Sequence, residues 1–241
     1  MTPESTPGGF RHFHEQLASL KEMLLDMSQK AEERTELAVE ALLLRDRGKA
    51  ELVIERDEDL NTLEVEVEHR AVELLALQQP MARDLRLIIG AIKVSNDLER
   101  VGDHAVNIAE CALRVLDGGG AMPSVPELGE MARLARLMLS NALDSFIRAD
   151  GALGRKVCAS DDEVDALQDS LTRILLTHMM GDPKTITPSL SLLLVGRNLE
   201  RIADLATNIA EDAVYLAEGK QIQHQRETAG TRPAAPPTRV R

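Results

Sequence analysis

Aromatic residues are nearly absent from this 241-residue sequence, which has three Phe, one Tyr and no Trp. Its hydrophobic content of 44% therefore consists mainly of aliphatic residues and methionine. These side chains pack well between helices, whereas the aromatic residues that favour strands are missing. The composition favours a helical core over a sandwich of sheets.

Cysteine, positive charge and long apolar runs are also scarce. Cys111 and Cys158 lie far apart and in no metal-binding or redox spacing, which indicates reduced thiols in a cytoplasmic protein. A net charge of −12 opposes binding to phosphate backbones, so we expect no direct nucleic-acid partner. The sequence has no run of apolar residues long enough to cross a membrane and no secretory leader pattern.

A polar phrase occurs twice. Residues 99–110 read ERVGDHAVNIAE and residues 200–211 read ERIADLATNIAE. A second pair of similar segments, IERDEDLNTLE at 54–64 and CASDDEVDALQ at 158–168, precedes them at about the same spacing. Self-similarity at a fixed interval indicates an internal duplication.

Apolar residues recur at intervals of three and four through both halves, which predicts long amphipathic helices. Glycines and prolines between them supply the breaks, most densely in LDGGGAMPSVPEL at 116–128. The expected helices are 10–46, 49–78, 81–117, 124–150, 152–181 and 184–219. Long helices joined by short turns form bundles. The prediction is an all-α tandem duplication of a three-helix bundle.

The expected domains follow from these breaks. We expect one bundle at 10–117 and a second at 128–219, joined by a linker at 118–127. The composition of 1–9 and of the Pro- and Ala-rich segment 220–241 favours disorder.

Acidic and amide side chains follow the third helix of each half at intervals of four, so they share one helix face. They are Glu99, Asp103 and Asn107, and then Glu200, Asp204 and Asn208. This face is roughly opposite the apolar stripe of the helix, so these side chains lie at the surface.

The second helix of each half supplies partners for these acids. If the first hairpin turns at Pro80 and the second between Asp182 and Pro183, residues at equal distance from each turn lie at equal height. The pairs brought together are Asp57 with Asp103, Asn61 with Glu99, Asp161 with Asp204, and Asp165 with Glu200.

Carboxylates that face each other across neighbouring helices repel, and a bound cation is the simplest relief. Oxygen ligands suit Mg²⁺, Mn²⁺, Ca²⁺ or iron, and zinc is less expected without nitrogen or sulfur ligands. The alternative of a solvated polar face stays open. The candidate ligands are Asp57, Asn61, Glu99, Asp103, Asn107, Asp161, Asp165, Glu200, Asp204 and Asn208.

The segments DLERVGDHAVNIAE and NLERIADLATNIAE, each preceded by an Asp-rich helix, resemble the PhoU family of bacterial phosphate-signalling proteins. The segment QPMARDLRLI at 79–88 also resembles the family. The resemblance covers 10–219 and implies two three-helix bundles that hold metal clusters, polynuclear ones included. Asn61 departs from the usual Asp of the family pattern, and Ala203 and Leu205 replace its Gly and His.

The resemblance also implies a role. Proteins of this kind are cytoplasmic homodimers or higher oligomers, peripheral to membrane complexes. They act on a phosphate ABC transporter, through its ATPase, and on a sensor histidine kinase, and they keep phosphate-starvation genes repressed when phosphate is plentiful. We therefore expect a regulator rather than an enzyme.

Two other functions are compatible with the pattern. The first is a metal-independent helical adaptor whose acidic faces bind a basic partner. The second is a carboxylate-bridged di-metal enzyme, which uses Glu-x-x-His motifs that point inward. Glu66 and His69 form one such motif, but Ser170 and Arg173 replace them in the second half, which disfavours the enzyme.

Overall fold

The structure, a computed structural model, describes residues 7–118 and 122–222 and is helical throughout. Most of the predicted terminal arms and part of the linker, namely 1–6, 119–121 and 223–241, lie outside the described residues. The helices are α1 (Pro7–Leu43), α2 (Arg47–Glu55), α3 (Glu58–Gln78), α4 (Ala82–Asp117), α5 (Pro126–Arg148), α6 (Gly151–Gly181) and α7 (Ile186–Glu218), with a 3₁₀ turn, η1 (Pro183–Thr185), before α7. The all-α prediction is confirmed, and Pro7–Gly9 form the first turn of α1 rather than part of an arm.

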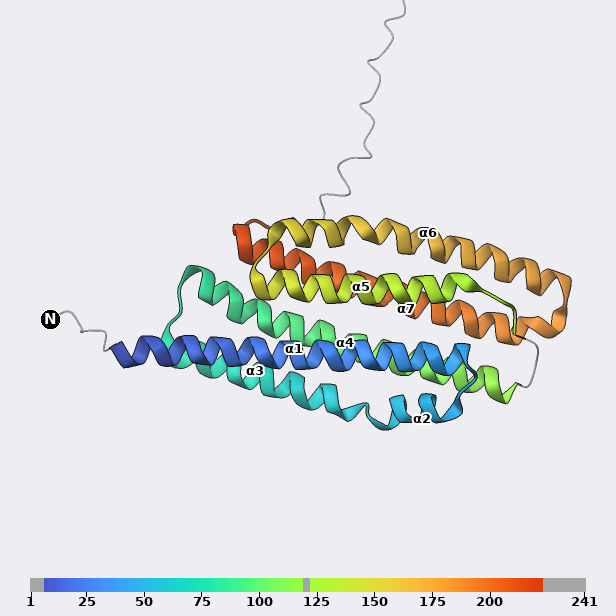
Figure 1. Cartoon of the computed structure of the whole chain (residues 1–241), viewed down its shortest axis with the longest axis horizontal. Helices are drawn as coiled ribbons and strands as arrows, with labels where there is room; N and C mark the ends of the chain where they lie inside the picture. The colour runs from blue at the N-terminus through green and yellow to red at the C-terminus, as the bar shows by residue number, and fades with distance from the viewer. Residues whose placement is uncertain (1–6, 119–121, 223–241) are drawn as a thin grey trace, which may run out of the picture.

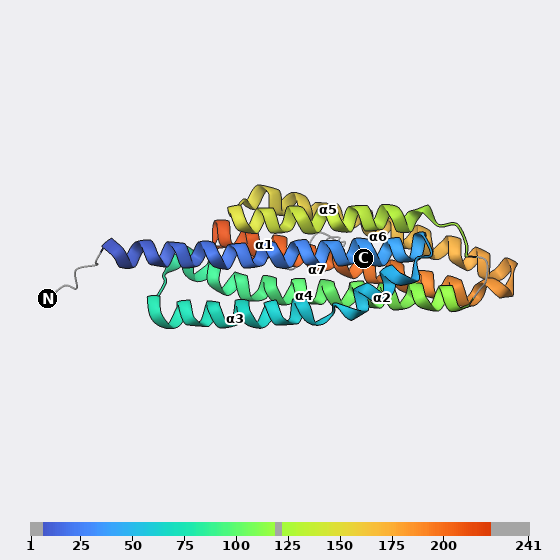
Figure 2. The same ribbon diagram turned by 60° about the horizontal axis from the view of Figure 1, so that its bottom comes forward.

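The helices form two bundles that lie side by side (Figures 1 and 2). α1 to α4 form the first bundle and α5 to α7 the second, and they join where α4 packs on α7 and α1 on α5. α4 and α7 run antiparallel, because Lys93 pairs with Asp212 while His104, further along α4, contacts Asn198. No helix among the described residues has the length and apolar character that a membrane crossing requires.

The two halves begin their second helices in the same way. Arg45 and Ala149 both adopt left-handed backbone conformations, with φ of 55° and 51°. The next residue in each half, Asp46 or Asp150, caps the helix that follows by accepting hydrogen bonds from its first backbone N–H groups. Gly48 and Gly151, which the sequence pattern favoured as breaks, instead lie inside the first helical turn.

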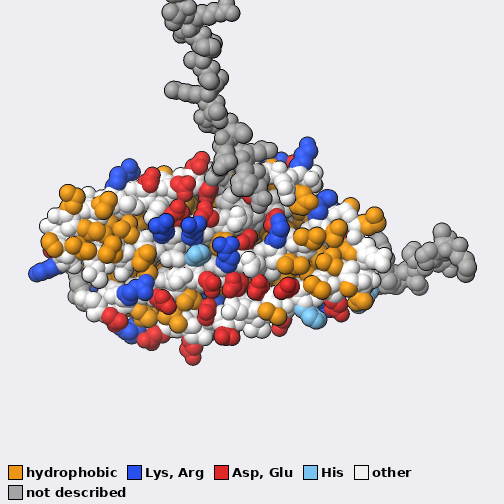
Figure 3. All heavy atoms as spheres, turned by 180° about the vertical axis from the view of Figure 1, so that it is seen from behind, with side chains coloured by type: hydrophobic (Ala, Val, Ile, Leu, Met, Phe, Trp, Pro, Cys, Tyr) orange, Lys and Arg blue, Asp and Glu red, His pale blue; other side chains and the backbone are white. Residues whose placement is uncertain are grey.

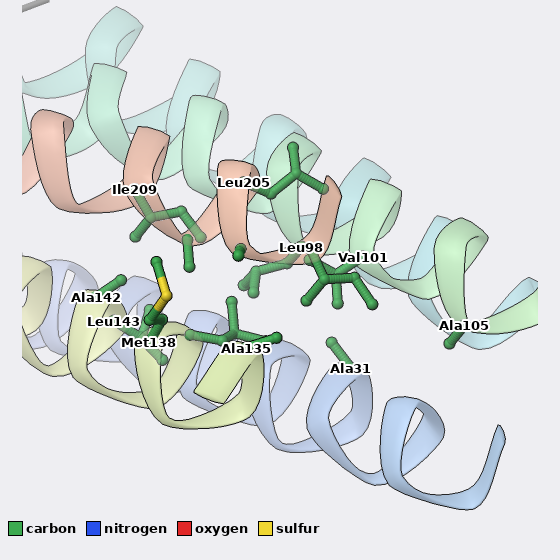
Figure 4. Close-up of a cluster of buried hydrophobic side chains, with 14 of the residues drawn as sticks. Ala31, Leu98, Val101, Ala105, Ala135, Met138, Ala142, Leu143, Leu205 and Ile209 are labelled. Atoms are coloured by element: carbon green, nitrogen blue, oxygen red, sulfur yellow. The ribbon is translucent and has the colours of Figure 1, made fainter. Parts of the chain in front are cut away.

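The core is aliphatic, as the composition predicts. α1, α4, α5 and α7 share a cluster of buried side chains that includes Ala31, Leu98, Met138 and Ile209 (Figure 4). The apolar stripe expected on the third helix of the first half is fully buried; its members are Val94, Leu98, Val101, Ala105, Ile108 and Ala112. The acids at intervals of four therefore face away from the core.

The prediction of one continuous helix over 49–78 is wrong at a single point. The helix breaks at Arg56 and Asp57, which separate α2 from α3. The guanidinium of Arg34, buried on α1, donates hydrogen bonds to the backbone carbonyl oxygens of Arg56 and of Asp57, the second at 3.3 Å. Because these carbonyls find a donor outside their own helix, the break is satisfied without Gly or Pro. A local sequence pattern cannot reveal such a distant partner.

The second half has no such break. α6 is continuous, and the position equivalent to Arg34 is Met138, which is 2% exposed and apolar. Without a buried donor, interrupted helical carbonyls at this point would have no partner.

Candidate metal-binding faces

Four carboxylates form what we call the first acidic cluster: Asp57 at the α2–α3 break, Glu64 on α3, and Glu99 and Asp103 on α4. Burial raises the pKa of Glu99, and the negative charges of Asp103, Glu64 and Asp57 raise it further. The amide of Asn96 on α4 donates a hydrogen bond of 3.2 Å to Glu64 Oε1 and so ties the two helices together at this height. The acids of the two helices therefore face the same space, as the hairpin argument predicts.

The second half repeats this arrangement in the second acidic cluster, made of Asp161, Asp165, Glu200 and Asp204. Burial raises the pKa of Glu200, followed by the charges of Asp204 and Asp165. Asp161 is only 6% exposed and lines, together with Asp204, an open cleft of about 340 Å³. Both hairpins thus place carboxylates where their charges disfavour the ionisation of the glutamate on the central helix, Glu99 or Glu200.

The three candidate asparagines differ in their positions. Asn208 lines the same cleft as Asp161 and Asp204. Asn61 and Asn107 lie on the exposed surfaces of α3 and α4.

The carboxylates of each acidic cluster lie near one another, but their oxygen atoms do not surround a common point. Among residues 7–118 and 122–222, no three His, Cys, Asp or Glu side chains converge closely enough to form a ready metal site. The chemistry of both clusters, with several carboxylate oxygens and no thiolate, matches the ligands of hard cations. The residues therefore fit a metal in donor type, although their side chains are not arranged in a coordination shell.

Glu64 belongs to the first acidic cluster but is absent from the candidate ligand set. It lies seven residues after Asp57, a spacing that places both on one face of a helix, and its charge acts on Glu99. That spacing was available in the sequence. The repeat position holds Gln168, so a search guided by matching acids in both halves passes over it.

Basic side chains lie between the two clusters, at the crossing of α4 and α7. Arg100 and Arg201 are the second residues of the repeated phrase. Together with His104 they line the same cleft as Asp161 and Asp204. His104 Nδ1 lies 2.9 Å from Asn198 Oδ1 across the helix pair, whereas Leu205, at the repeat position of His104, is buried. Figure 3 shows Lys, Arg and His side chains near the middle of this face, with acidic side chains on both sides.

Asp97 is the most perturbed acid of the crossing. It is 9% exposed, and burial raises its pKa to about 6, with a smaller contribution from the charge of Asp212. Arg100 lies 3.6 Å away, while Lys93 is paired with Asp212 at 2.9 Å. The residue equivalent to Asp97 in the second half is the neutral Asn198.

The fold and the site define a class: a duplicated helical-bundle protein with an acidic face on each half. The PhoU domain family matches residues 24–112 and 128–213, one stretch in each bundle. The chain belongs to this family. The family resemblance and the duplicated fold predicted from the sequence are both confirmed.

Relatives match over nearly their whole length. A phosphate-specific transport system accessory protein PhoU homolog from Aquifex aeolicus is 40% identical over 87% of this chain and 95% of its own. One from Caulobacter vibrioides is 38% identical over 90% of this chain and 94% of its own.

Two crystal structures are also similar. PhoU from Pseudomonas aeruginosa has a TM-score of 0.82 and 37% identity, covering 86% of this chain and all of that one. The phosphate transport system regulatory protein PhoU from Streptococcus pneumoniae has a TM-score of 0.80 and 30% identity over 87% and 99% of the two chains. These relatives are regulatory and accessory proteins, which confirms the prediction of a regulator rather than an enzyme.

Proposed function

We propose that this chain is a cytoplasmic regulator of phosphate uptake and phosphate-starvation signalling. In this proposal it acts on the phosphate ABC transporter, through its ATPase, and on the sensor histidine kinase, and it represses the phosphate-responsive genes when phosphate is plentiful. The observation that carries the proposal is the match to phosphate-transport accessory proteins over both bundles and nearly the full length of each relative.

Metal ions are the second part of the proposal. In each half the Glu-x-x-x-Asp pair of the central helix, Glu99 with Asp103 or Glu200 with Asp204, would hold a cation together with acids of the neighbouring helix. Support comes from the raised pKa values of Glu99 and Glu200. Burial is the larger cause, and repulsion from neighbouring carboxylates, which a bound cation would relieve, adds to it. Iron, manganese, magnesium and zinc are the candidates, in mononuclear or polynuclear sites. Rotation of the exposed side chains would complete the coordination. The proposed ligands are Asp57, Asn61, Glu99, Asp103 and Asn107 in the first half, and Asp161, Asp165, Glu200, Asp204 and Asn208 in the second.

A homodimer is the expected assembly, with no contact to nucleic acid. Sedimentation of the purified chain tests this part, since a monomer at micromolar concentration would contradict it.

A metal-independent adaptor is the second candidate function. The observation that favours it is that no ready coordination shell exists among the described acids. An adaptor would use the same two clusters to contact basic side chains of a partner directly.

Genetic complementation tests the proposal. A strain that lacks the gene receives the wild-type chain or a variant with Glu99→Gln, Asp103→Asn, Glu200→Gln and Asp204→Asn, and a phosphate-responsive promoter is measured in phosphate-rich medium. Wild type is expected to repress the promoter and the variant to leave it active. A control with the same change in charge carries Glu22→Gln, Glu51→Gln, Glu66→Gln and Glu163→Gln at exposed positions outside the clusters.

The outcomes separate the candidates. A wild-type chain that does not repress the promoter contradicts the regulatory proposal. Equal loss of repression in the control variant would mean that total charge, and not the clusters, matters. If wild type represses and never contains metal, the adaptor function replaces the metal-dependent one.

A further inference from the structure

Exposed apolar residues gather at two places on one face of the molecule. This face, formed by α3, α4, α7 and α6, lies opposite α1 and α5 and is the one seen in Figure 3. The first apolar patch, around the α3–α4 turn, contains Val72, Met81, Leu85 and Ile89. The second apolar patch, around the α6–α7 turn, contains Leu176, Met180, Ile186, Leu190 and Leu194. Figure 3 shows apolar side chains towards both ends of the face and charged ones between them.

The two patches are equivalent in the duplication. Leu85 and Ile89 on α4 correspond to Ile186 and Leu190 on α7, at the same distances from the repeated phrase. Because α4 and α7 run antiparallel, equivalent residues lie at opposite ends of the face. The face therefore has an approximate two-fold axis, which passes between Arg100 and Arg201 where the helices cross.

Charge follows the same symmetry. An acidic cluster lies on each side of the axis, beside the two arginines at the centre. A second copy of this chain docked through this face would bring acidic clusters against acidic clusters, which is unfavourable. An anionic membrane surface is disfavoured for the same reason. A fitting partner carries basic side chains on each side of its own axis, clear of the two arginines, and apolar side chains further out.

We propose that this face docks across the two-fold axis of a symmetric protein dimer. Each partner subunit covers one apolar patch and presents basic groups to one acidic cluster, whose four carboxylates keep a net negative charge when they hold one divalent cation. Exposed apolar patches flanked by polar groups are typical of protein interaction sites, and a two-fold partner explains why the patch is present twice. The inference rests on the proposed function, because the paired ATPase subunits of an ABC transporter are the partner to test. One chain of the proposed homodimer then docks on each pair of ATPase subunits.

Affinity and stoichiometry are measured with the phosphate transporter complex of the same organism in lipid nanodiscs. The variants are Ile89→Glu in the first patch, Leu190→Glu in the second, and the two combined. Leu137→Glu on α5 is the matched control, since Leu137 is 49% exposed and Leu190 51%. We expect a loss of about tenfold or more for each single variant, similar for the two patches, a larger loss for the double variant and no change for the control. Mass measurement should give one homodimer per transporter.

Each failure has a distinct signature. A wild-type chain that does not bind the transporter contradicts the proposed function, and this inference with it. Binding by wild type that Ile89→Glu and Leu190→Glu leave unchanged, that only one patch affects, or that occurs at two homodimers per transporter overturns the two-fold docking alone. Unchanged thermal unfolding of the variants shows that any loss arises at the surface.

Discussion

The two halves of the molecule place the same acids on their central helices but support them differently. In the first half the neighbouring helix is broken at Asp57 and held by Arg34. In the second half the neighbouring helix is continuous, and Asp161 is buried in its middle at 6% exposure. The two halves thus share the Glu-x-x-x-Asp pair of the central helix. They differ in the backbone of the neighbouring helix that brings further acids to this pair.

Close packing shows the same pattern of paired differences. A Cβ added at Gly102 would lie 2.6 Å from Leu60 Cδ1, so an alanine there requires the Leu60 side chain to shift. The equivalent residues of the second half are Ala203 and Val164, one methyl larger and one methylene smaller. The halves therefore differ by compensated changes, and exchanging residues between them tests each compensation.

The largest effect is expected from Met138→Arg, which copies the first half into the second. The second half offers no broken helix to receive a guanidinium, so a charge would be buried without partners. We expect a loss of roughly 3–5 kcal/mol in the free energy of unfolding. Chemical denaturation measures it, and Met138→Leu serves as the apolar control. A loss below about 1 kcal/mol would mean that the second half can accept the arginine.

Asp97→Asn copies the second half into the first at the helix crossing. The folded-state pKa of Asp97, about 6, is above the ordinary 3.8, so its ionisation opposes folding. This penalty is absent below pH 4, grows as the pH rises and is complete above pH 6. The variant should therefore match wild type at pH 4 and be more stable by about 3 kcal/mol at pH 7.5. Unfolding of the metal-free proteins at both pH values checks this, and equal stabilities at pH 7.5 would contradict it.

Arg34→Met should destabilise the first half, because the carbonyl groups of Arg56 and Asp57 lose their donor. The expected loss is about 2 kcal/mol. Arg34→Lys keeps the charge but lacks the forked geometry, so it should recover only part of the stability. Hydrogen exchange at the α2–α3 break locates the effect. Wild-type stability and protection in Arg34→Met would show that the break does not depend on the guanidinium.

The smallest effect is expected at Gly102. Gly102→Ala should destabilise by about 1 kcal/mol, because overpacking against Leu60 exceeds the gain in helix propensity. The double variant Gly102→Ala with Leu60→Val copies the second half and should recover that loss. Thermal unfolding of the single and double variants measures the coupling. Additive effects would show that the two positions are independent.

The sequence predicted the features that repeat along one helix or across one hairpin. The fully buried stripe that includes Val94 and Leu98, and the convergence of Glu99 with acids of the preceding helix, follow from helical periodicity and equal distance from a turn.

Features that depend on a distant contact were not predicted. The break at Asp57 requires Arg34, which lies on α1, 23 residues earlier in the sequence. The turns at Arg45 and Ala149 use left-handed residues other than glycine, so the nearby glycines indicated the wrong positions. The pairing of His104 with Asn198 arises between bundles, where neither repeat alone contains the information.

Metal content is the most direct test of the central claim that each half carries its own cation site. The purified chain is incubated with Mg²⁺, Mn²⁺, Fe²⁺ and Zn²⁺ in turn, desalted and analysed for bound metal. It is compared with a Glu99→Gln and Asp103→Asn variant, a Glu200→Gln and Asp204→Asn variant, and the variant that combines all four substitutions. We predict stoichiometric metal in wild type, loss of the metal of one half in each variant with two substitutions, and complete loss in the variant with all four. Wild-type protein that retains none of these metals would contradict the claim and leave two acidic faces that bind a basic partner directly.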